Sequence, residues 1–209
     1  MELETHPFEP FLPSESKVLF LGTFPAKPIR WSMNFYYPNF TNDFWRIMGM
    51  IFYSDKEHFE IRTGSSPALI QKSNHAKPTF PQNRWNEEAI REFCSSHGFA
   101  FSDTAEIIHR LKGTASDADL QILKARDIPS HVEQLPKCQA IVATGTLASE
   151  VVSQQFGCKI PKVGESSEII LPQSGRRLNF FRLPSTSRAY PLALEKKADF
   201  YRKMLLSLD

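Results

Sequence analysis

The stretch Lys17-Val-Leu-Phe-Leu-Gly-Thr-Phe-Pro25 decides the fold class of this 209-residue chain. Its apolar run, residues 18–21, ends at a glycine, as is typical of a strand buried on both faces of a parallel sheet. An aromatic segment follows at residues 34–45, reading Asn-Phe-Tyr-Tyr-Pro-Asn-Phe-Thr-Asn-Asp-Phe-Trp. Ligands of open α/β sheets bind beyond the carboxyl ends of the strands, so the sequence predicts a pocket where this strand ends.

Strands and helices alternate along the rest of the chain. Apolar side chains at helical spacing predict a helix that begins near Asn42, and capping residues predict helices that begin at Asn86 and Asp127. Further strands are expected over residues 99–101, 140–144 and 178–183. This alternation predicts an α/β fold, a three-layer α/β/α sandwich with a mostly parallel central sheet.

Length and composition fit a single domain over residues 1–209, with an irregular insertion at about residues 54–86. The net charge of +2 permits nucleic-acid binding without demanding it, because a local basic patch is sufficient. No apolar run is long enough to cross a membrane and no signal peptide is recognisable, so we expect a cytoplasmic protein with no membrane partner.

Neither a metal ion nor an iron–sulfur cluster is expected. The three cysteines, Cys94, Cys138 and Cys158, lie far apart, and such a cluster normally takes four thiolates. The histidines are scattered without the spacing of metal ligands. Glycine-rich nucleotide motifs are also missing, so the sequence predicts no cofactor.

Three motifs in fixed order carry a resemblance to a known family: Gly22-Thr-Phe-Pro25, Tyr36-Tyr37-Pro38-x-x-x-Asn42-x-Phe44-Trp45 and Leu183-Pro-Ser-Thr-Ser187. Together they resemble the uracil-DNA glycosylase superfamily, nearest its hypoxanthine-DNA glycosylase-like branch and the mismatch-specific uracil/thymine-DNA glycosylases. The stretch Gly113-x-x-Ser-Asp117 also looks like the first of these branches. The resemblance runs from about residue 17 to the C-terminus, outside the insertion.

This resemblance implies a uracil-DNA glycosylase-like fold and a monofunctional DNA glycosylase of base-excision repair. Such an enzyme flips a damaged or deaminated base, such as uracil, hypoxanthine or a mismatched base, out of double-stranded DNA. It then hydrolyses the N-glycosidic bond without a cofactor. We expect the chain to act on DNA as a monomer.

A flipped base needs an aromatic surface to replace the neighbours that it loses in the duplex. Tyr37 is the first candidate for this surface, with Phe24 and Tyr36 beside it. The strand-end residues Gly22, Thr23 and Pro25 are expected to contact the same base. The alternative for the aromatic residues is that they fill the core at the end of a strand.

Two residues are candidates for catalysis. The resemblance assigns Asn42 to orient water or to hydrogen-bond the base, whereas its alternative role is to cap a helix. Asp103, at the end of a predicted strand, can position a water molecule or accept hydrogen bonds in a turn. The mismatch-specific branch carries its catalytic asparagine where this chain has Phe24, and Phe40-Thr41 replace a His-Pro pair of related proteins.

The loop after the last predicted strand is the candidate DNA-binding element. Ser185, Thr186 and Ser187 offer hydroxyl and backbone N–H groups to phosphates. The resemblance implies a side chain that fills the gap left by the base, with Arg188 as first choice and Tyr190 as second. The alternative is a loop that only leads into the last helix.

Two further functions stay open at this point. A non-catalytic protein of the same fold that binds DNA or nucleobases would explain the phenylalanine in the first motif. A small-molecule hydrolase with Asp103 as its base would use the same pocket.

Overall fold

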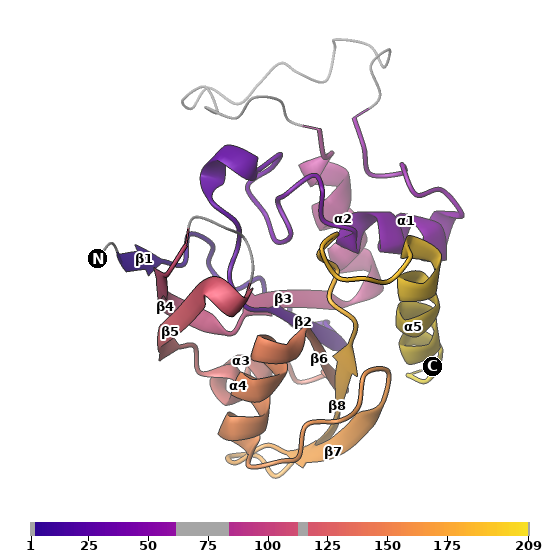
Figure 1. The fold of residues 1–209 in the computed structure, drawn as a ribbon. Helices are drawn as coiled ribbons and strands as arrows, with labels where there is room; N and C mark the ends of the chain where they lie inside the picture. Colours follow the sequence, from indigo (N-terminus) through magenta and orange to yellow (C-terminus); the bar gives the residue numbers. More distant parts are fainter. Residues whose placement is uncertain (1–2, 62–83, 113–116, 209) are drawn as a thin grey trace.

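A five-stranded sheet forms the centre of this computed structural model, which describes residues 3–61, 84–112 and 117–208 (Figure 1). The strand order is β3-β2-β6-β8-β7. The strands are β2 (Val18–Gly22), β3 (Phe99–Asp103), β6 (Ala140–Thr144), β7 (Ser166–Ile170) and β8 (Arg177–Leu183). Strands β3, β2, β6 and β8 run parallel, and β7 pairs antiparallel to β8 at the edge. The sheet is therefore mixed, and the prediction of an α/β fold is confirmed.

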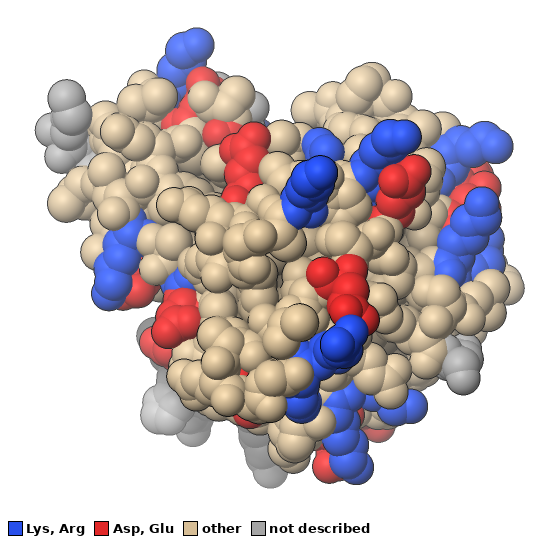
Figure 2. Space-filling view, turned by 90° about the horizontal axis from the view of Figure 1, so that it is seen from below, with Lys and Arg blue, Asp and Glu red and all other residues tan. Residues whose placement is uncertain are grey.

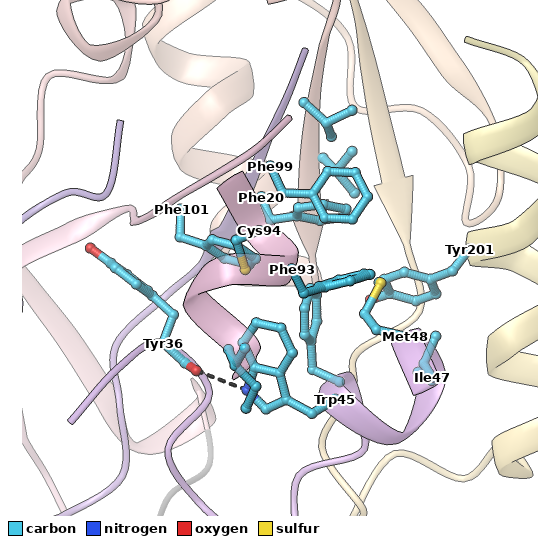
Figure 3. Close-up of a cluster of buried hydrophobic side chains, with 14 of the residues drawn as sticks. Phe20, Tyr36, Trp45, Ile47, Met48, Phe93, Cys94, Phe99, Phe101 and Tyr201 are labelled. Carbon is cyan, nitrogen blue, oxygen red and sulfur yellow. Dashed lines mark hydrogen bonds between the residues drawn. The ribbon is translucent and has the colours of Figure 1, made fainter. Parts of the chain in front are cut away.

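Alternate side chains of the central strand β2 enter two different cores. Val18 and Phe20 belong to the larger core, together with helices α1 (Phe44–Tyr53), α2 (Glu87–His97) and α5 (Leu194–Leu206). Leu19 and Leu21 belong to the second core, with α3 (Ile128–Glu133) and α4 (Thr146–Phe156). Since alternate residues of a strand point to opposite faces, the two helix groups pack against opposite faces of the central sheet. The larger core is rich in aromatic side chains, as Figure 3 shows.

Two predicted helix starts are confirmed by their capping bonds. The Asn86 side chain accepts a hydrogen bond from the N–H of Ala89, and Asp127 accepts one from the N–H of Ser130. Such bonds satisfy N–H groups that have no partner within the helix. Helix α2 ends at Gly98, whose φ of +69° is the left-handed conformation that favours glycine.

A second, three-stranded antiparallel sheet was not predicted. It consists of β1 (Leu3–Thr5), β4 (Ala105–Arg110) and β5 (Leu120–Ala125), in the order β1-β4-β5. The guanidinium of Arg110 lies 2.8 Å from the carboxylate of Glu4, which ties β1 to β4. The prediction of a three-layer α/β/α sandwich did not include this sheet, whose strand β4 follows β3 directly in the chain.

The expected insertion at residues 54–86 lies mostly outside the described residues, since its residues 62–83 are not among them. Its two described ends join each other through a bridge between Glu60 and Trp85. Phe59 and Trp85 are both buried in the larger core. These ends are thus part of the packed domain.

No helix in the described part of the chain combines the length and apolar character needed to cross a membrane. Figure 2 shows the molecule from below the view of Figure 1, and basic side chains there lie close to acidic ones. The described residues of this face therefore do not form a purely basic patch of the kind that binds a nucleic-acid backbone.

A buried ion pair fixes α5 to the start of α1. The ammonium of Lys197, a residue that is 1% exposed, lies 2.8 Å from Asp43 Oδ2 and also donates to the carbonyl of Ser187 over 2.8 Å. The N–H of Asp43 donates to the carbonyl of Thr186 at 2.9 Å. These bonds hold the loop after β8 against the segment that precedes α1.

Replacing Lys197 by methionine is expected to lower the free energy of unfolding by about 3 kcal/mol, because the buried carboxylate of Asp43 loses its main counter-charge. Urea unfolding of the purified variant measures this loss. The matched control is Lys196→Met, an exposed lysine on the same helix, which we expect to change stability by less than about 0.5 kcal/mol. Equal effects of the two substitutions would contradict the structural role of the ion pair.

Candidate active site

A cavity of about 120 Å³ lies at the carboxyl ends of the four parallel strands. Gly22, Asp103 and Thr144 are the last residues of β2, β3 and β6, and Ser185 follows the end of β8. Tyr37 and Asn42, from the segment that precedes α1, also line the cavity. The prediction that these distant segments meet at one pocket is confirmed.

Most of the predicted site residues line this cavity, and they are Gly22, Thr23, Phe24, Pro25, Tyr37, Asn42, Asp103, Ser185, Thr186, Ser187 and Arg188. Tyr190 is not part of the lining; its ring lies 6.0 Å from the ammonium of Lys197. The cavity is also lined by Phe8, Ala26, Pro38, Asn39, Thr41, Asp117 and Thr144.

The prediction that Tyr36 helps to stack a base is wrong. Its side chain lies in the larger core, where the residue is 2% exposed, and its hydroxyl donates to the carbonyl of Glu9 at 3.1 Å. Figure 3 shows Tyr36 among the core side chains, with its backbone carbonyl accepting from the indole of Trp45 at 3.1 Å. The two neighbouring tyrosines point in different directions, so Tyr37 lines the cavity and Tyr36 does not.

Tyr37 offers a rigid aromatic surface. Its ring lies parallel to that of Phe44, with the centroids 4.1 Å apart. Its hydroxyl forms a 3.0 Å hydrogen bond with the hydroxyl of Thr144, and burial raises the pKa of this phenol above its usual range. The backbone has a φ of 54°, a conformation that costs a bulky residue about 1–3 kcal/mol and persists only where other contacts enforce it.

Asp103 is held by a histidine that sequence reasoning missed. Nε2 of His6 donates to Asp103 Oδ2 over 2.8 Å, and both residues are buried. The other oxygen, Oδ1, lies against Gly22, where a Cβ atom would come within 2.6 Å of it. The glycine therefore gives the carboxylate its place at the strand end, and the histidine fixes its orientation.

His6 reaches this position through the unpredicted sheet. It follows β1 directly, and its N–H donates to the carbonyl of Glu106 in β4 at 2.8 Å. A strand of three residues, such as β1, is too short to produce a recognisable periodic pattern in the sequence. Only a search for histidines near the cavity, with the fold known, could have found this residue.

Asn42 lies at the cavity and also bonds to the start of α1, just before the N-cap residue Asp43. It lines the cavity, and its Oδ1 accepts a hydrogen bond from the N–H of Phe44 at 2.9 Å, at the start of α1. This bond engages the acceptor atom of the side chain and leaves its NH₂ group as the donor for a ligand. The geometry therefore suits Asn42 to donate hydrogen bonds more than to activate water.

Asp117 is a second carboxyl group in the lining, noted in the sequence only as part of a motif. Its Oδ2 accepts a hydrogen bond from the hydroxyl of Thr23 at 3.3 Å. Burial, together with the negative charge of Asp103, raises the pKa of Asp117 to about 6. It therefore carries a proton at a much higher pH than an ordinary aspartate does.

The loop after β8 forms the rim of the cavity. The Arg188 side chain is 59% exposed, and its guanidinium lies 3.6 Å from Asp43. Ser185 and Ser187 are half-buried, and the Ser185 hydroxyl accepts the N–H of Ser187 at 3.2 Å. Thr186, by contrast, is buried at 2% exposure, which leaves the serines and Arg188 as the accessible part of the rim.

Among the described residues, no group of three or more His, Cys, Asp or Glu side chains is arranged to hold a metal ion. The chemistry available at the cavity is thus that of an aromatic ring, an amide, hydroxyl groups and two carboxyl groups.

Comparison with known proteins gives a match at the level of the fold. No protein-family model matches the sequence, and no curated protein matches it. The structure is similar to the solution NMR structure of a proposed uracil DNA glycosylase from Methanosarcina acetivorans, with a TM-score of 0.56 and 18% sequence identity. The match covers 98% of this chain and 99% of that chain. The fold is glycosylase-like. At 18% identity the similarity shows the fold alone, so the roles of individual residues have to be argued from the geometry of the site.

Asp117→Asn is expected to stabilise the protein at pH 7 but not at pH 4. The folded-state pKa is raised, so the folded protein holds a proton that the unfolded chain releases between about pH 4 and pH 6, and stability falls over that range. The neutral amide removes this loss of unfolding free energy. Because solvent screens the charge, the loss amounts to roughly 1–2 kcal/mol. Urea unfolding at both pH values measures it, with the surface substitution Asp199→Asn as control. A difference that does not change with pH would contradict the expectation.

Proposed function

We propose that this protein is a DNA glycosylase that hydrolyses the N-glycosidic bond of a damaged or deaminated base in base-excision repair. The observation that supports it best is the meeting of Tyr37, Asn42 and Asp103 in one cavity whose rim is the Ser185–Arg188 loop. The similarity of the fold to that of a proposed uracil DNA glycosylase agrees with this function. The proposed partner is double-stranded DNA, and the reaction needs no cofactor.

Base binding begins with extrusion of the target nucleotide from the duplex, which costs a few kcal/mol of stacking and pairing. The Tyr37 ring replaces part of that stacking. Because it is already held by Phe44 and Thr144, it loses little conformational freedom when a base binds. Gly22, Thr23 and Pro25 supply the cavity wall at the end of β2.

Negative charge develops on the departing base in the transition state, and Asn42 is placed to stabilise it. Its NH₂ group donates a hydrogen bond to an oxygen or nitrogen atom of the base. The residue stands at the start of α1, a helix of 10 residues, whose N-terminal end carries partial positive charge. Fixed dipoles aimed at the developing charge stabilise the transition state without reorganisation.

Asp103 is the proposed acceptor for the attacking water. The imidazole of His6 fixes one of its oxygens, so the other is available to orient the water toward C1′ of the sugar. His6 acts here as a positioning residue through Asp103. Phe24 stands in the first motif, and its ring lies edge-on to His6 with the centroids 5.1 Å apart. An apolar ring cannot activate water, which leaves that task to Asp103.

The rim is proposed to contact the DNA backbone. Ser185 and Ser187 donate to phosphates and Arg188 enters the gap left by the base, with Tyr190 further along the same loop. Thr186 would act through its backbone, because its side chain is buried. Among the branches of the superfamily, the position of Asn42 favours the hypoxanthine-DNA glycosylase-like one, with uracil and mismatched bases as further substrates.

In the direct test, the protein is incubated with DNA duplexes that contain uracil, hypoxanthine, xanthine or a G·T mismatch, and abasic sites are then detected. We expect excision of at least one base, lowered by about 10²–10³-fold in Asn42→Ala and in Asp103→Asn. Asp199→Asn, at the surface, serves as the control for both.

Two results would replace the proposal with one of its alternatives. Saturable, salt-sensitive DNA binding without any abasic sites would indicate a non-catalytic reader of DNA. A lack of affinity for nucleic acid together with hydrolysis of a small substrate would indicate the small-molecule hydrolase.

The stacking role of Tyr37 predicts a graded effect on binding. Tyr37→Phe keeps the ring and should bind a duplex with a damaged base almost as tightly as the wild type. Tyr37→Ala should bind it about 10-fold more weakly, since base–aromatic stacking contributes about 1–3 kcal/mol. Fluorescence anisotropy measures both, with Tyr53→Ala, an exposed tyrosine at the end of α1, as control. Equal binding by the alanine and phenylalanine variants would exclude stacking on this ring.

A further inference from the structure

Two carboxyl groups line the same cavity in different surroundings. Asp103 is bonded to the imidazole of His6, whereas the hydrogen bond of Asp117 within the described residues comes from the Thr23 hydroxyl. Asp117 also lies beside Gly145, at the start of α4, where a Cβ atom would stand 3.5 Å from its Oδ2. Asp117 is therefore half-buried, beside a hydroxyl group and a glycine backbone.

The surroundings of Asp117 disfavour its negatively charged form, because they contain a second carboxyl group and no described cation that pairs with it. Asp103, at the end of β3, adds negative charge, and burial raises the pKa of Asp117 to about 6. Tyr37, from the segment before α1, lines the same cavity with a neutral phenol. Arg188, from the rim, has its guanidinium at Asp43. In the described part of the chain no cation pairs with Asp117.

Hydrolysis of an N-glycosidic bond is accelerated by two groups in opposite protonation states. The attacking water gives up a proton, which calls for a carboxylate, and the departing base gains an electron pair, which calls for a proton donor. Two carboxyl groups in unlike surroundings are the usual arrangement for such a division of roles. Asp103 fits the first role, through its bond to His6, and Asp117 fits the second.

We propose that Asp117 is the general acid that protonates the departing base, an inference that rests on the proposed glycosylase function. The bond between C1′ and the base nitrogen breaks, and its electron pair stays with the base. The Asp117 carboxyl transfers its proton to a nitrogen or oxygen atom of the base. The water oxygen bonds to C1′ while its proton passes to Asp103. Exchange with solvent then returns Asp117 to its acid form and Asp103 to its carboxylate.

Single-turnover excision between pH 5 and pH 9 tests this role, with the substrate that the wild type cleaves best. The wild-type rate is expected to fall about tenfold per pH unit above roughly pH 6, as the acid form of Asp117 is lost. Asp117→Asn cannot give up a proton, so its rate should be about 10²-fold lower at pH 5.5 and should lack this fall. At high pH the two rates should converge.

The conservative variant Asp117→Glu separates a catalytic role from a structural one, because it restores an ionisable proton donor. We expect it to recover part of the rate and the fall with rising pH. Asp199→Asn should reproduce the wild-type profile. Far-UV circular dichroism confirms that each variant is folded before its rates are compared.

Two outcomes would overturn the inference and can be told apart. If Asp117→Asn keeps the wild-type rate and pH profile while excision proceeds, Asp117 is not the acid and the glycosylase function stands. If the folded wild type releases no base from any duplex at any pH, the glycosylase function itself fails, and the role of Asp117 fails with it.

Discussion

The parallel pairing of β2 with β3 and β6 is the constraint on which the site depends. It sets Gly22 beside Asp103 and brings the ends of β6 and β8 to the same edge of the sheet. The residues at that edge line one cavity although they are far apart in the sequence. The buried pair of Lys197 and Asp43 completes the arrangement, because it joins the loop after β8 to the segment that carries Tyr37 and Asn42. The sheet fixes the floor of the cavity, and this ion pair fixes its rim.

The sequence predicted those strands and helices whose residues carry a local pattern, such as an apolar run or a capping residue. The apolar run of β2 and the caps at Asn86 and Asp127 are local features, and each had the predicted outcome. Strand-end logic also placed Tyr37, Asn42 and Ser185 at one pocket. Tyr36 was assigned wrongly because the segment is irregular. Without a periodic pattern, the sequence does not tell which of two adjacent aromatic residues enters the core and which lines the cavity. The position of His6 depends on the pairing of β1 with β4 across about a hundred residues, which no local pattern reports.

The proposed function has to account for the phenylalanine in the first motif of this chain. In the proposed mechanism, the asparagine of that motif is replaced by Asn42 at a helix start and by two carboxyl groups in unlike surroundings. Asp103 is oriented by an imidazole, and burial keeps Asp117 in its acid form to unusually high pH. The proposed amide, acid and base thus come from three different segments of the chain.

The most direct measurement is a crystal structure of the protein bound to a duplex whose hypoxanthine or uracil nucleotide carries a 2′-fluoro group that prevents hydrolysis. We expect the base to be extruded, to lie against the ring of Tyr37 and to occupy the space between Asn42 and Asp103. A base that stays stacked in the duplex, or DNA bound on another face of the protein, would contradict it.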